Sequence, residues 1–229
     1  MSGVAGAQVA GPTLGAPTEH SADPKSKSLH AFVRLPVVYT AIGGSEFDGR
    51  HAYSFDAQHV AFLPKLSGGF GVRPSAGLLL KNPLPSFSLS TAASLEYTKH
   101  QAISYNVGNS WYEHKEAKFY DLCLELRGYL DIGALKPFIG IAPGYAWLEL
   151  PQGITVTDTN NFVKWADIEL RGFTFEASIG ALYQFLPFLA ADASFGYRLQ
   201  GLSASSHGPL SGFGFSPGWV ASLGAVGMI

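Results

Sequence analysis

The sequence has little charge, a single cysteine and no long apolar run. Charged residues make up 14% of the 229 residues, about half of the usual share. The formal net charge is −2, so the chain lacks the basic surface of a nucleic-acid-binding protein. Because Cys123 is the only cysteine, an internal disulfide framework and a cysteine-rich zinc site are excluded.

A membrane-spanning helix is also missing, since it needs about 20 mainly apolar residues. The apolar stretch 137–148 is too short and is broken by Gly140 and Pro143. Residues 199–229 contain no Asp, Glu, Lys or Arg, but Gly, Ser and Pro interrupt them. The low charge is typical of a membrane protein, so the chain has to cross the membrane with strands and not with helices.

Residues 1–28 are rich in Gly, Ala and Pro and then become polar, which predicts a disordered tail. They lack the basic start and apolar centre of a secretory signal peptide. The segment Ala5–Ala7 nevertheless matches the small-x-small pattern of a cleavage site. Met1 is thus either a start inside a longer signal peptide or the beginning of a low-complexity tail, and we expect the folded domain at residues 29–229.

From Leu29 onward, apolar and polar residues alternate with the period of two that is typical of strands. In residues 172–199, two alternating runs are separated only by Leu186-Pro187, which predicts a hairpin. Six further segments alternate in the same way, so we predict eight strands. Long and short connections follow one another in turn. The long ones cover residues 43–66, 99–116, 150–170 and 200–217, and the short ones cover 81–85, 131–135 and 186–187.

This order of connections is expected of an outer-membrane barrel, which has short periplasmic turns and long extracellular loops. We therefore predict an all-β fold, a closed eight-stranded antiparallel up-and-down transmembrane β-barrel. A closed barrel leaves no unpaired strand edge in hydrocarbon. We expect a monomer in the bacterial outer membrane, surrounded by outer-membrane lipid.

One face of the predicted strands carries large apolar residues, and the other carries small residues and charges. The interior of an eight-stranded barrel is just wide enough for side chains to fill, so we predict that the large apolar face meets lipid. A soluble ligand-binding barrel would need the opposite arrangement. Unpaired buried charges are costly, so we expect the inward charges to pair across the lumen. These residues are Arg34, Arg73, Glu96, Asp121, Glu125, Arg127, Glu176, Asp192 and Arg198.

The inward charges have two functional interpretations. A filled lumen without a channel is favoured, because eight strands leave little void. A narrow pore for small solutes is the alternative.

Aromatic residues predict the two membrane interfaces, where outer-membrane barrels carry aromatic girdles. One set lies near the long connections and consists of Tyr39, Tyr97, Tyr145, Trp147, Tyr197 and Trp219. The other set lies near the short connections and includes Phe87, Phe185 and Phe188.

Two segments carry a resemblance to known proteins. ELRGYLDIGALKPFIGIAPGYAWLEL (125–150) contains the pattern Pro-aromatic-x-Gly-x-x-x-Gly-aromatic, and FEASIGALYQFLPFLAADASFGYRLQ (175–200) ends in an aromatic residue, Arg, Leu and Gln. Both resemble hairpins of bacterial eight-stranded outer-membrane β-barrels, the family similar to the OmpA transmembrane domain. The resemblance covers about residues 29–229 and implies the barrel fold and its location, but little about activity. Family members usually end in an aromatic residue, whereas this chain ends in Ile229.

Some barrels of this size are lipid A deacylases with an Arg-x-x-His-x-Ser arrangement. Here Arg198 and Ser203 are present, but Gly201 stands where the family has His, so the hydroxyl has no base to activate it. Ser206-His207 is either a substitute or a polar loop tip. We predict a protein that is not an enzyme and has no cofactor, with a lipid A-modifying enzyme as the least favoured alternative.

Histidines and acids occur in the first two long connections, but their spacing is not that of a metal site. These residues are His51, Asp56, His59, His100, Glu113, His114 and Glu116. We predict no metal, and we interpret Cys123 as a small packing residue. The loops 43–66 and 150–170 carry side chains suited to contact with an extracellular ligand. These are Phe47, Asp48, Arg50, Tyr53, Asn160, Asn161, Lys164 and Trp165. We therefore predict a structural or surface-interaction role.

Overall fold

The computed structural model describes residues 27–44, 47, 52–54, 60–62, 65–103, 106–107, 110–111, 116–157, 163–204 and 215–229. Almost all of these residues lie in antiparallel strands. Across these ranges, no helix has the length and apolar character needed to cross a membrane. The predicted tail is not part of them, except for its last two residues, and β1 begins at Ser28.

The strands that form the ring are long, and short strands accompany the connections. In chain order the strands are β1 (Ser28–Ile42), β2 (Ala52–Ser54), β3 (Val60–Phe62), β4 (Lys65–Val72), β5 (Ser75–Leu84), β6 (Phe87–Ile103), β7 (Asn106–Val107), β8 (Ser110–Trp111), β9 (Glu116–Leu130), β10 (Leu135–Thr157), β11 (Val163–Leu186), β12 (Leu189–Ala204) and β13 (Phe215–Met228).

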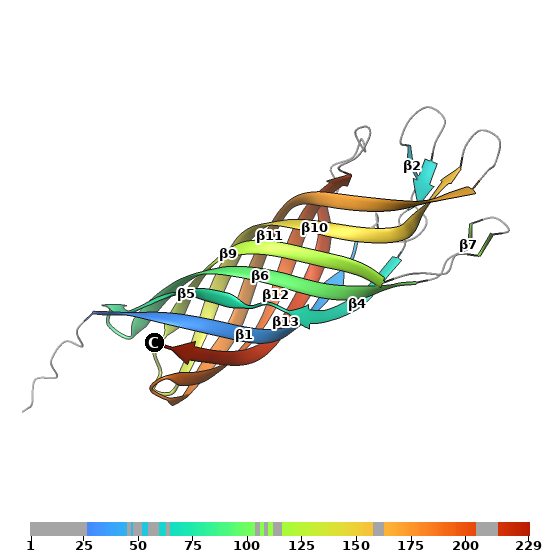
Figure 1. Ribbon diagram of the computed structural model, residues 1–229. Helices are drawn as coiled ribbons and strands as arrows, with labels where there is room; N and C mark the ends of the chain where they lie inside the picture. The colour runs from blue at the N-terminus through green and yellow to red at the C-terminus, as the bar shows by residue number, and fades with distance from the viewer. Residues whose placement is uncertain are drawn as a thin grey trace, which may run out of the picture.

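Consecutive strands pair around a closed ring (Figure 1). β1 pairs with β13 from Phe32↔Met228 to Ile42↔Gly218, which joins the first strand to the last. β4 and β5 together make one barrel strand, because each pairs with β1 on one side and β6 on the other. With β6, β9, β10, β11, β12 and β13 the ring has eight barrel strands. The predicted fold class is confirmed.

Pro74 explains why one barrel strand is divided into β4 and β5. Proline has no N–H to give to the ladder, so regular pairing stops between Val72 and Ser75. Single hydrogen bonds still tie the break to both neighbouring strands. The Arg73 N–H donates to the Pro36 carbonyl at 3.1 Å, and the Leu95 N–H donates to the Pro74 carbonyl at 3.1 Å.

The three short connections lie at one end of the barrel, together with the start of β1 and the end of β13 (Figure 1). We call this the turn end and the opposite end the loop end. At the loop end the strands run further than the sequence predicted. β10 continues to Thr157 and β11 begins at Val163, so most of the predicted loop 150–170 is paired strand.

The lengths of β10 and β11 show why that loop boundary was wrong. They have 23 and 24 residues, whereas a strand needs about 9–11 residues to cross a bilayer. Ladder pairing does not stop at the membrane surface. β3 adds to this extension by pairing with β10 through Thr155–Thr157, and β2 pairs with β3.

Candidate functional site

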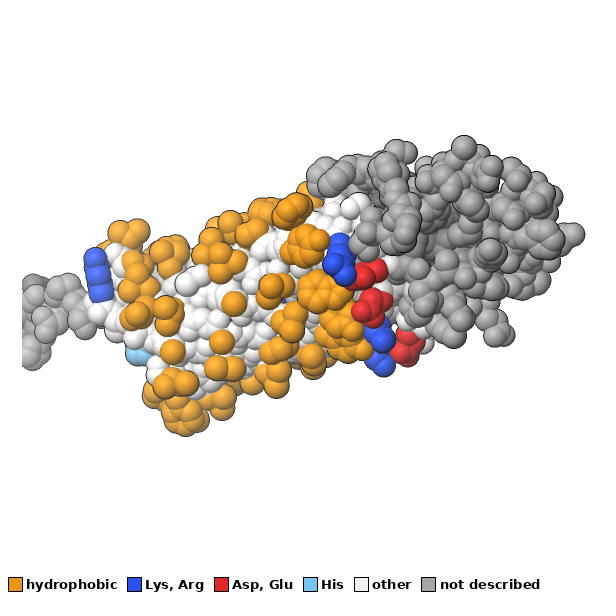
Figure 2. Space-filling model, turned by 45° about the horizontal axis from the view of Figure 1, so that its top comes forward, with side chains coloured by type: hydrophobic (Ala, Val, Ile, Leu, Met, Phe, Trp, Pro, Cys, Tyr) orange, Lys and Arg blue, Asp and Glu red, His pale blue; other side chains and the backbone are white. Residues whose placement is uncertain are grey.

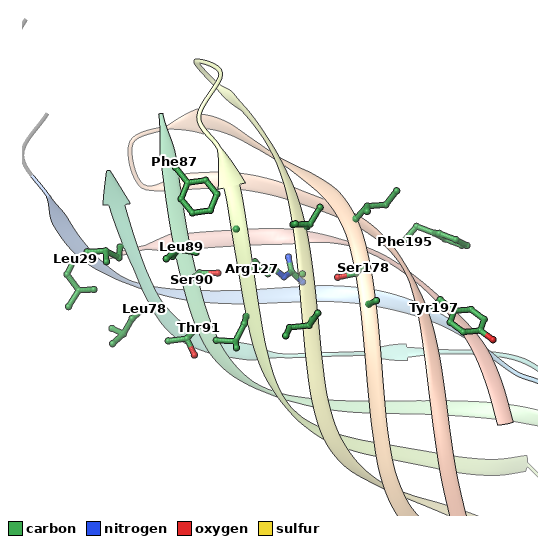
Figure 3. Close-up of a pocket in the computed structure, with 18 of the residues that line it drawn as sticks. Leu29, Leu78, Phe87, Leu89, Ser90, Thr91, Arg127, Ser178, Phe195 and Tyr197 are labelled. Carbon is green, nitrogen blue, oxygen red and sulfur yellow. The ribbon is translucent and has the colours of Figure 1, made fainter. Parts of the chain in front are cut away.

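The outer surface of the barrel is apolar over most of its height (Figure 2). Leu122, Ile139 and Phe173 expose 54%, 71% and 70% of their surface. A hollow of about 1090 Å³ is lined mainly by apolar side chains that come from all eight barrel strands. Figure 3 shows Leu78 and Phe195 pointing away from the ring, while Arg127 points into it. An apolar surface of this extent requires a lipid environment.

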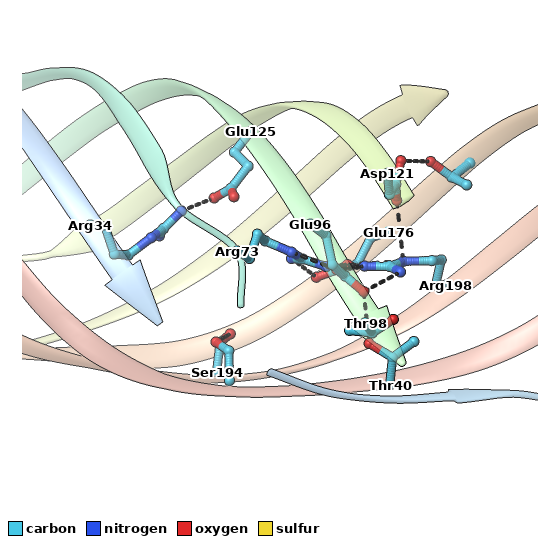
Figure 4. Close-up of polar contacts among 12 residues, drawn as sticks. Arg34, Thr40, Arg73, Glu96, Thr98, Asp121, Glu125, Glu176, Ser194 and Arg198 are labelled. Carbon is cyan, nitrogen blue, oxygen red and sulfur yellow. Dashed lines mark hydrogen bonds and ion pairs between the residues drawn. The ribbon is translucent and has the colours of Figure 1, made fainter. Parts of the chain in front are cut away.

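Inside the ring, two arginines and two glutamates from four barrel strands converge (Figure 4). The Arg73 guanidinium donates to Glu96 Oε2 through Nε at 2.8 Å and to Glu176 Oε2 through Nη2 at 2.7 Å. Arg198 Nη2 donates to the same two oxygens at 2.6 and 2.8 Å. Asp121 lies beside them, with Oδ2 3.6 Å from Arg198 Nε. These five residues are the loop-side charge cluster.

A second cluster lies nearer the turn end and consists of Arg34, Glu125, Arg127 and Asp192. Arg34 is paired with Glu125. Arg127 Nη2 lies 3.0 Å from Glu125 Oε2, and Arg127 Nη1 donates to Asp192 Oδ2 at 2.9 Å. We call this group the turn-side charge cluster. Its two positive and two negative charges balance.

The nine predicted lumen residues are thus all brought together, and each exposes 6% of its surface or less. Their four arginines face five carboxylates. The surplus negative charge belongs to the loop-side charge cluster, since the turn-side cluster is neutral. Asp121 has the weakest ionic contact of that cluster, and its Oδ1 accepts a hydrogen bond from Thr174 at 2.9 Å.

Large apolar side chains also fill the lumen at both ends, and here the sequence interpretation was wrong. The loop-side apolar cluster consists of Ile42, Phe47, Leu66, Ala117, Phe119, Ala146, Leu148, Leu150, Leu170 and Leu202. The turn-side apolar cluster consists of Phe32, Leu79, Ala92, Tyr129, Phe138, Leu182, Ala190, Val226 and Met228. The two charge clusters lie between them, which excludes the simple rule that only small and charged residues face inward.

The layers are in contact with each other. The Arg127 guanidinium lies over the Phe138 ring at 4.4 Å, and Arg198 lies over Phe119 at 5.4 Å. The interior cavity bounded by Phe32 and Arg34 has about 20 Å³, which is room for about one water molecule. The charged and apolar layers therefore touch each other at these two places.

Aromatic side chains form a belt on the outer surface near the loop end. Tyr97, Tyr120 and Trp147 follow one another on β6, β9 and β10, with ring centroids 5.1 and 5.2 Å apart. Tyr197 and Trp219 lie 4.8 Å apart on β12 and β13. The remaining neighbouring pairs of the belt are Tyr39 with Phe70 at 4.9 Å and Tyr145 with Phe173 at 5.7 Å.

Each of the eight barrel strands therefore contributes to the belt, and the six predicted residues all belong to it. Phe70, Tyr120 and Phe173 complete it and were missing from the prediction. They occupy outward positions on their own strands, so continuing the alternation along each strand would have found them. At the turn end, Phe185 and Phe188 are each 59% exposed.

The remaining candidates for chemistry do not converge. Arg198 faces inward and is fully buried, whereas Ser203 lies on the opposite face of β12 and its hydroxyl donates to the Arg171 carbonyl at 3.4 Å. His100 is buried, with its ring nitrogens 3.0 Å from Thr98 Oγ1 and 3.0 Å from the Ser67 carbonyl oxygen. Cys123 is buried in the lumen.

The other predicted residues of the loops lie mainly outside the described ranges. This applies to His51, Asp56, His59, Glu113, His114, Ser206, His207, Asp48, Arg50, Asn160 and Asn161. Of Tyr53, Lys164 and Trp165 only the strand position is described. Among the described residues, no group of three or more His, Cys, Asp or Glu side chains could hold a metal ion.

Comparison with known proteins agrees on the fold. No family model matches the sequence, and no curated protein matches it. The solved structure of the outer membrane protein OprG from Pseudomonas aeruginosa matches with a TM-score of 0.50 and 11% identity, over 90% of this chain and 98% of that one. Neisserial surface protein A matches with a TM-score of 0.49 and 14% identity, over 89% and 99%.

The closed ring, the apolar outer surface and the aromatic belt define the class of the protein. It is an integral membrane β-barrel of the kind found in bacterial outer membranes. Among the described residues, four layers of side chains line its lumen, two apolar and two charged.

Proposed function

We propose that this protein is a non-enzymatic outer-membrane barrel that does not conduct solutes and acts through its outer surfaces, as a monomer and without a cofactor. The observation that carries the proposal is the layered lumen. Apolar side chains close both ends, and the charged groups between them are held by one another. A pore would need a continuous polar path, whereas Phe119, Leu148 and Leu170 are each exposed by 2% or less at the loop end.

The closed lumen leaves two surfaces for function, the lipid-facing wall and the loop end. At the loop end, β10 and β11 continue beyond the aromatic belt, and the β2–β3 hairpin extends their sheet. This projecting sheet, with the connections around it, is the surface that we assign to contact with an extracellular ligand. Support for its location comes from the turn end, which has only short connections, as periplasmic ends of such barrels do.

Conductance across a planar lipid bilayer tests the closed lumen. The folded chain is expected to give no single-channel steps above the leak of the protein-free bilayer. Steady openings that scale with the amount of inserted protein would overturn this part of the proposal. Lipid A from cells with and without the protein should have the same mass spectrum, because the Ser203 hydroxyl donates to the Arg171 carbonyl and Gly201 stands where the deacylases have His.

Complementation separates an envelope role from a surface-interaction role. Cells that lack the protein are compared in detergent sensitivity after receiving the whole chain or a variant with residues 151–168 replaced by a two-residue turn. Equal rescue by both chains supports a structural role of the barrel itself. Rescue by the whole chain alone assigns the function to the projecting sheet. If the cells that lack the protein show no change in detergent sensitivity, the envelope role is wrong.

A further inference from the structure

Among the described residues, charged side chains lie directly beyond the aromatic belt on β6, β9, β10 and β11. Lys99 follows Tyr97 by two residues, and Glu149 follows Trp147 by two residues. Figure 2 shows such charges where the apolar band ends. The charged residues at this level, between 35% and 58% exposed, are Lys99, Glu116, Lys118, Glu149, Glu169 and Arg171.

These residues all belong to β6, β9, β10 and β11, which are adjacent in the ring. The other four barrel strands have uncharged residues two positions beyond the belt. Those residues are Gly68, Ala41, Leu199 and Pro217. The barrel thus presents one charged and one uncharged face at the same height.

The cross-strand register of the charged face sets two pairs of like charges opposite each other, besides the favourable pair of Lys118 and Glu149. Lys99 lies directly opposite Lys118 on β9, and Glu149 lies directly opposite Glu169 on β11. Like charges directly opposite each other destabilise a pair of strands. The two lysines do have carboxylates nearby, Lys99 with Glu116 at 3.2 Å and Lys118 with Glu149 at 3.9 Å. Exposed pairs of this kind are weak and are screened by salt.

The height of the lysine pair matches the headgroup layer of a bilayer. Two residues along a strand correspond to about 7 Å, and strand tilt reduces this to about 5 Å along the membrane normal. The headgroup region adds about 5–7 Å on each side of the hydrocarbon core. With the aromatic belt at the edge of the hydrocarbon, the ammonium groups lie among lipid headgroups.

We propose that Lys99 and Lys118 together bind the phosphate of an anionic lipid headgroup in the leaflet at the loop end. A phosphate between the two ammonium groups offsets their mutual repulsion and adds an acceptor to the carboxylate that each lysine already faces. The uncharged face offers no such site, so the anionic lipid is held on the β6–β9 side. This inference rests on the proposed membrane location of the barrel.

The test measures which lipids contact the folded chain in phosphatidylcholine nanodiscs. Spin-labelled phosphatidic acid and spin-labelled phosphatidylcholine are compared by the fraction that becomes motionally restricted. A lysine near a membrane surface changes affinity by about fivefold. Lys99→Gln should therefore lower the selectivity for phosphatidic acid by about fivefold, and the double variant with Lys118→Gln should lower it further.

A matched control changes two lysines that lie outside the pair. Lys27 and Lys65 are exposed, and neither lies opposite another lysine in the described register. The double variant Lys27→Gln/Lys65→Gln should keep the wild-type selectivity. Equal losses in both double variants would overturn the proposal, because net charge alone would then explain the binding. Unheated gel mobility in SDS verifies that each variant is folded.

Inorganic phosphate distinguishes the source of the anion. At an ionic strength matched with sodium chloride, it should leave the wild-type selectivity unchanged. Loss of selectivity would assign the lysine pair to free phosphate and overturn the lipid assignment. Absence of any restricted lipid would refute the membrane barrel itself, whereas restricted lipid without selectivity would refute only the lysine site.

Discussion

Glu96 is at the centre of the loop-side charge cluster, and its replacement by Gln tests whether that cluster holds the lumen together. The carboxylate is fully buried and accepts hydrogen bonds from Arg73, Arg198 and the Thr40 hydroxyl, the last at 2.8 Å. Glu96→Gln keeps the shape of the side chain but removes the negative charge that faces two buried guanidinium groups. Removing one partner of a buried ion pair costs about 3–5 kcal/mol, so we expect a loss of that size in the free energy of unfolding.

Asp121→Asn is the matched control because it also neutralises a buried carboxylate of the same cluster. Asp121 is 3.6 Å from Arg198, and the lumen has four arginines for five carboxylates, so its removal balances the charges. The Thr174 hydroxyl can still donate to the amide oxygen. We expect a cost of about 1 kcal/mol or less, the size of one ordinary hydrogen bond.

Urea unfolding of the refolded chain in lipid vesicles measures both values. Tryptophan fluorescence reports the transition, since Trp147 and Trp219 lie in the outer belt, and unheated gel mobility in SDS gives an independent reading. The free energy of unfolding should be highest for the wild type, slightly lower for Asp121→Asn and much lower for Glu96→Gln. Equal costs for the two variants would refute the reasoning, because the surplus carboxylate would then be as necessary as the central one. A cost below about 1 kcal/mol for Glu96→Gln would refute it as well.

Three further predictions concern the packing of the wall and the lumen. A Cβ added at Gly144 would lie 2.6 Å from Thr174 Oγ1. Gly144→Ala should therefore lower the free energy of unfolding in urea by about 1–3 kcal/mol. The control Gly227→Ala should leave it unchanged, because an added Cβ there meets open space. Cys123 should resist a bulky maleimide in the folded chain and react after unfolding, and rapid labelling of the folded barrel would contradict the closed lumen. Ile141→Arg places a charge on the lipid-facing wall and should cost about 2–4 kcal/mol in vesicles; a negligible cost would place that position outside the hydrocarbon.

Much of the barrel could be predicted from local sequence patterns. Alternation in residues 172–199 fixed two strands and their turn, because a strand places successive side chains on opposite faces. The alternating lengths of the connections indicated the up-and-down order. The nine inward charges and the six interface aromatics followed from the same period, and the structure places them on the inner and outer faces respectively.

The pattern could not show where the membrane ends. Within the bilayer, Leu122 and Leu124 face out while Asp121 and Glu125 face in. Beyond the belt the two faces exchange character: at β9, Lys118 faces out and Phe119 faces in. Beyond the belt, Pro151 and Gly153 interrupt the alternation of β10, and its register shifts between Leu150 and Ile154. The pattern therefore predicted a loop where β10 and β11 continue.

By itself, the sequence determined the strands, their order and the class of the fold, because these depend on periods within short segments and on the lengths between them. Only the tertiary structure decided what fills the lumen and which charges are partners. Closure of the ring brings Arg73, Glu96, Glu176 and Arg198 from distant parts of the chain to hydrogen-bonding distance. It also sets the register that places Lys99 beside Lys118. Such contacts depend on the stagger between strands, which no single strand encodes.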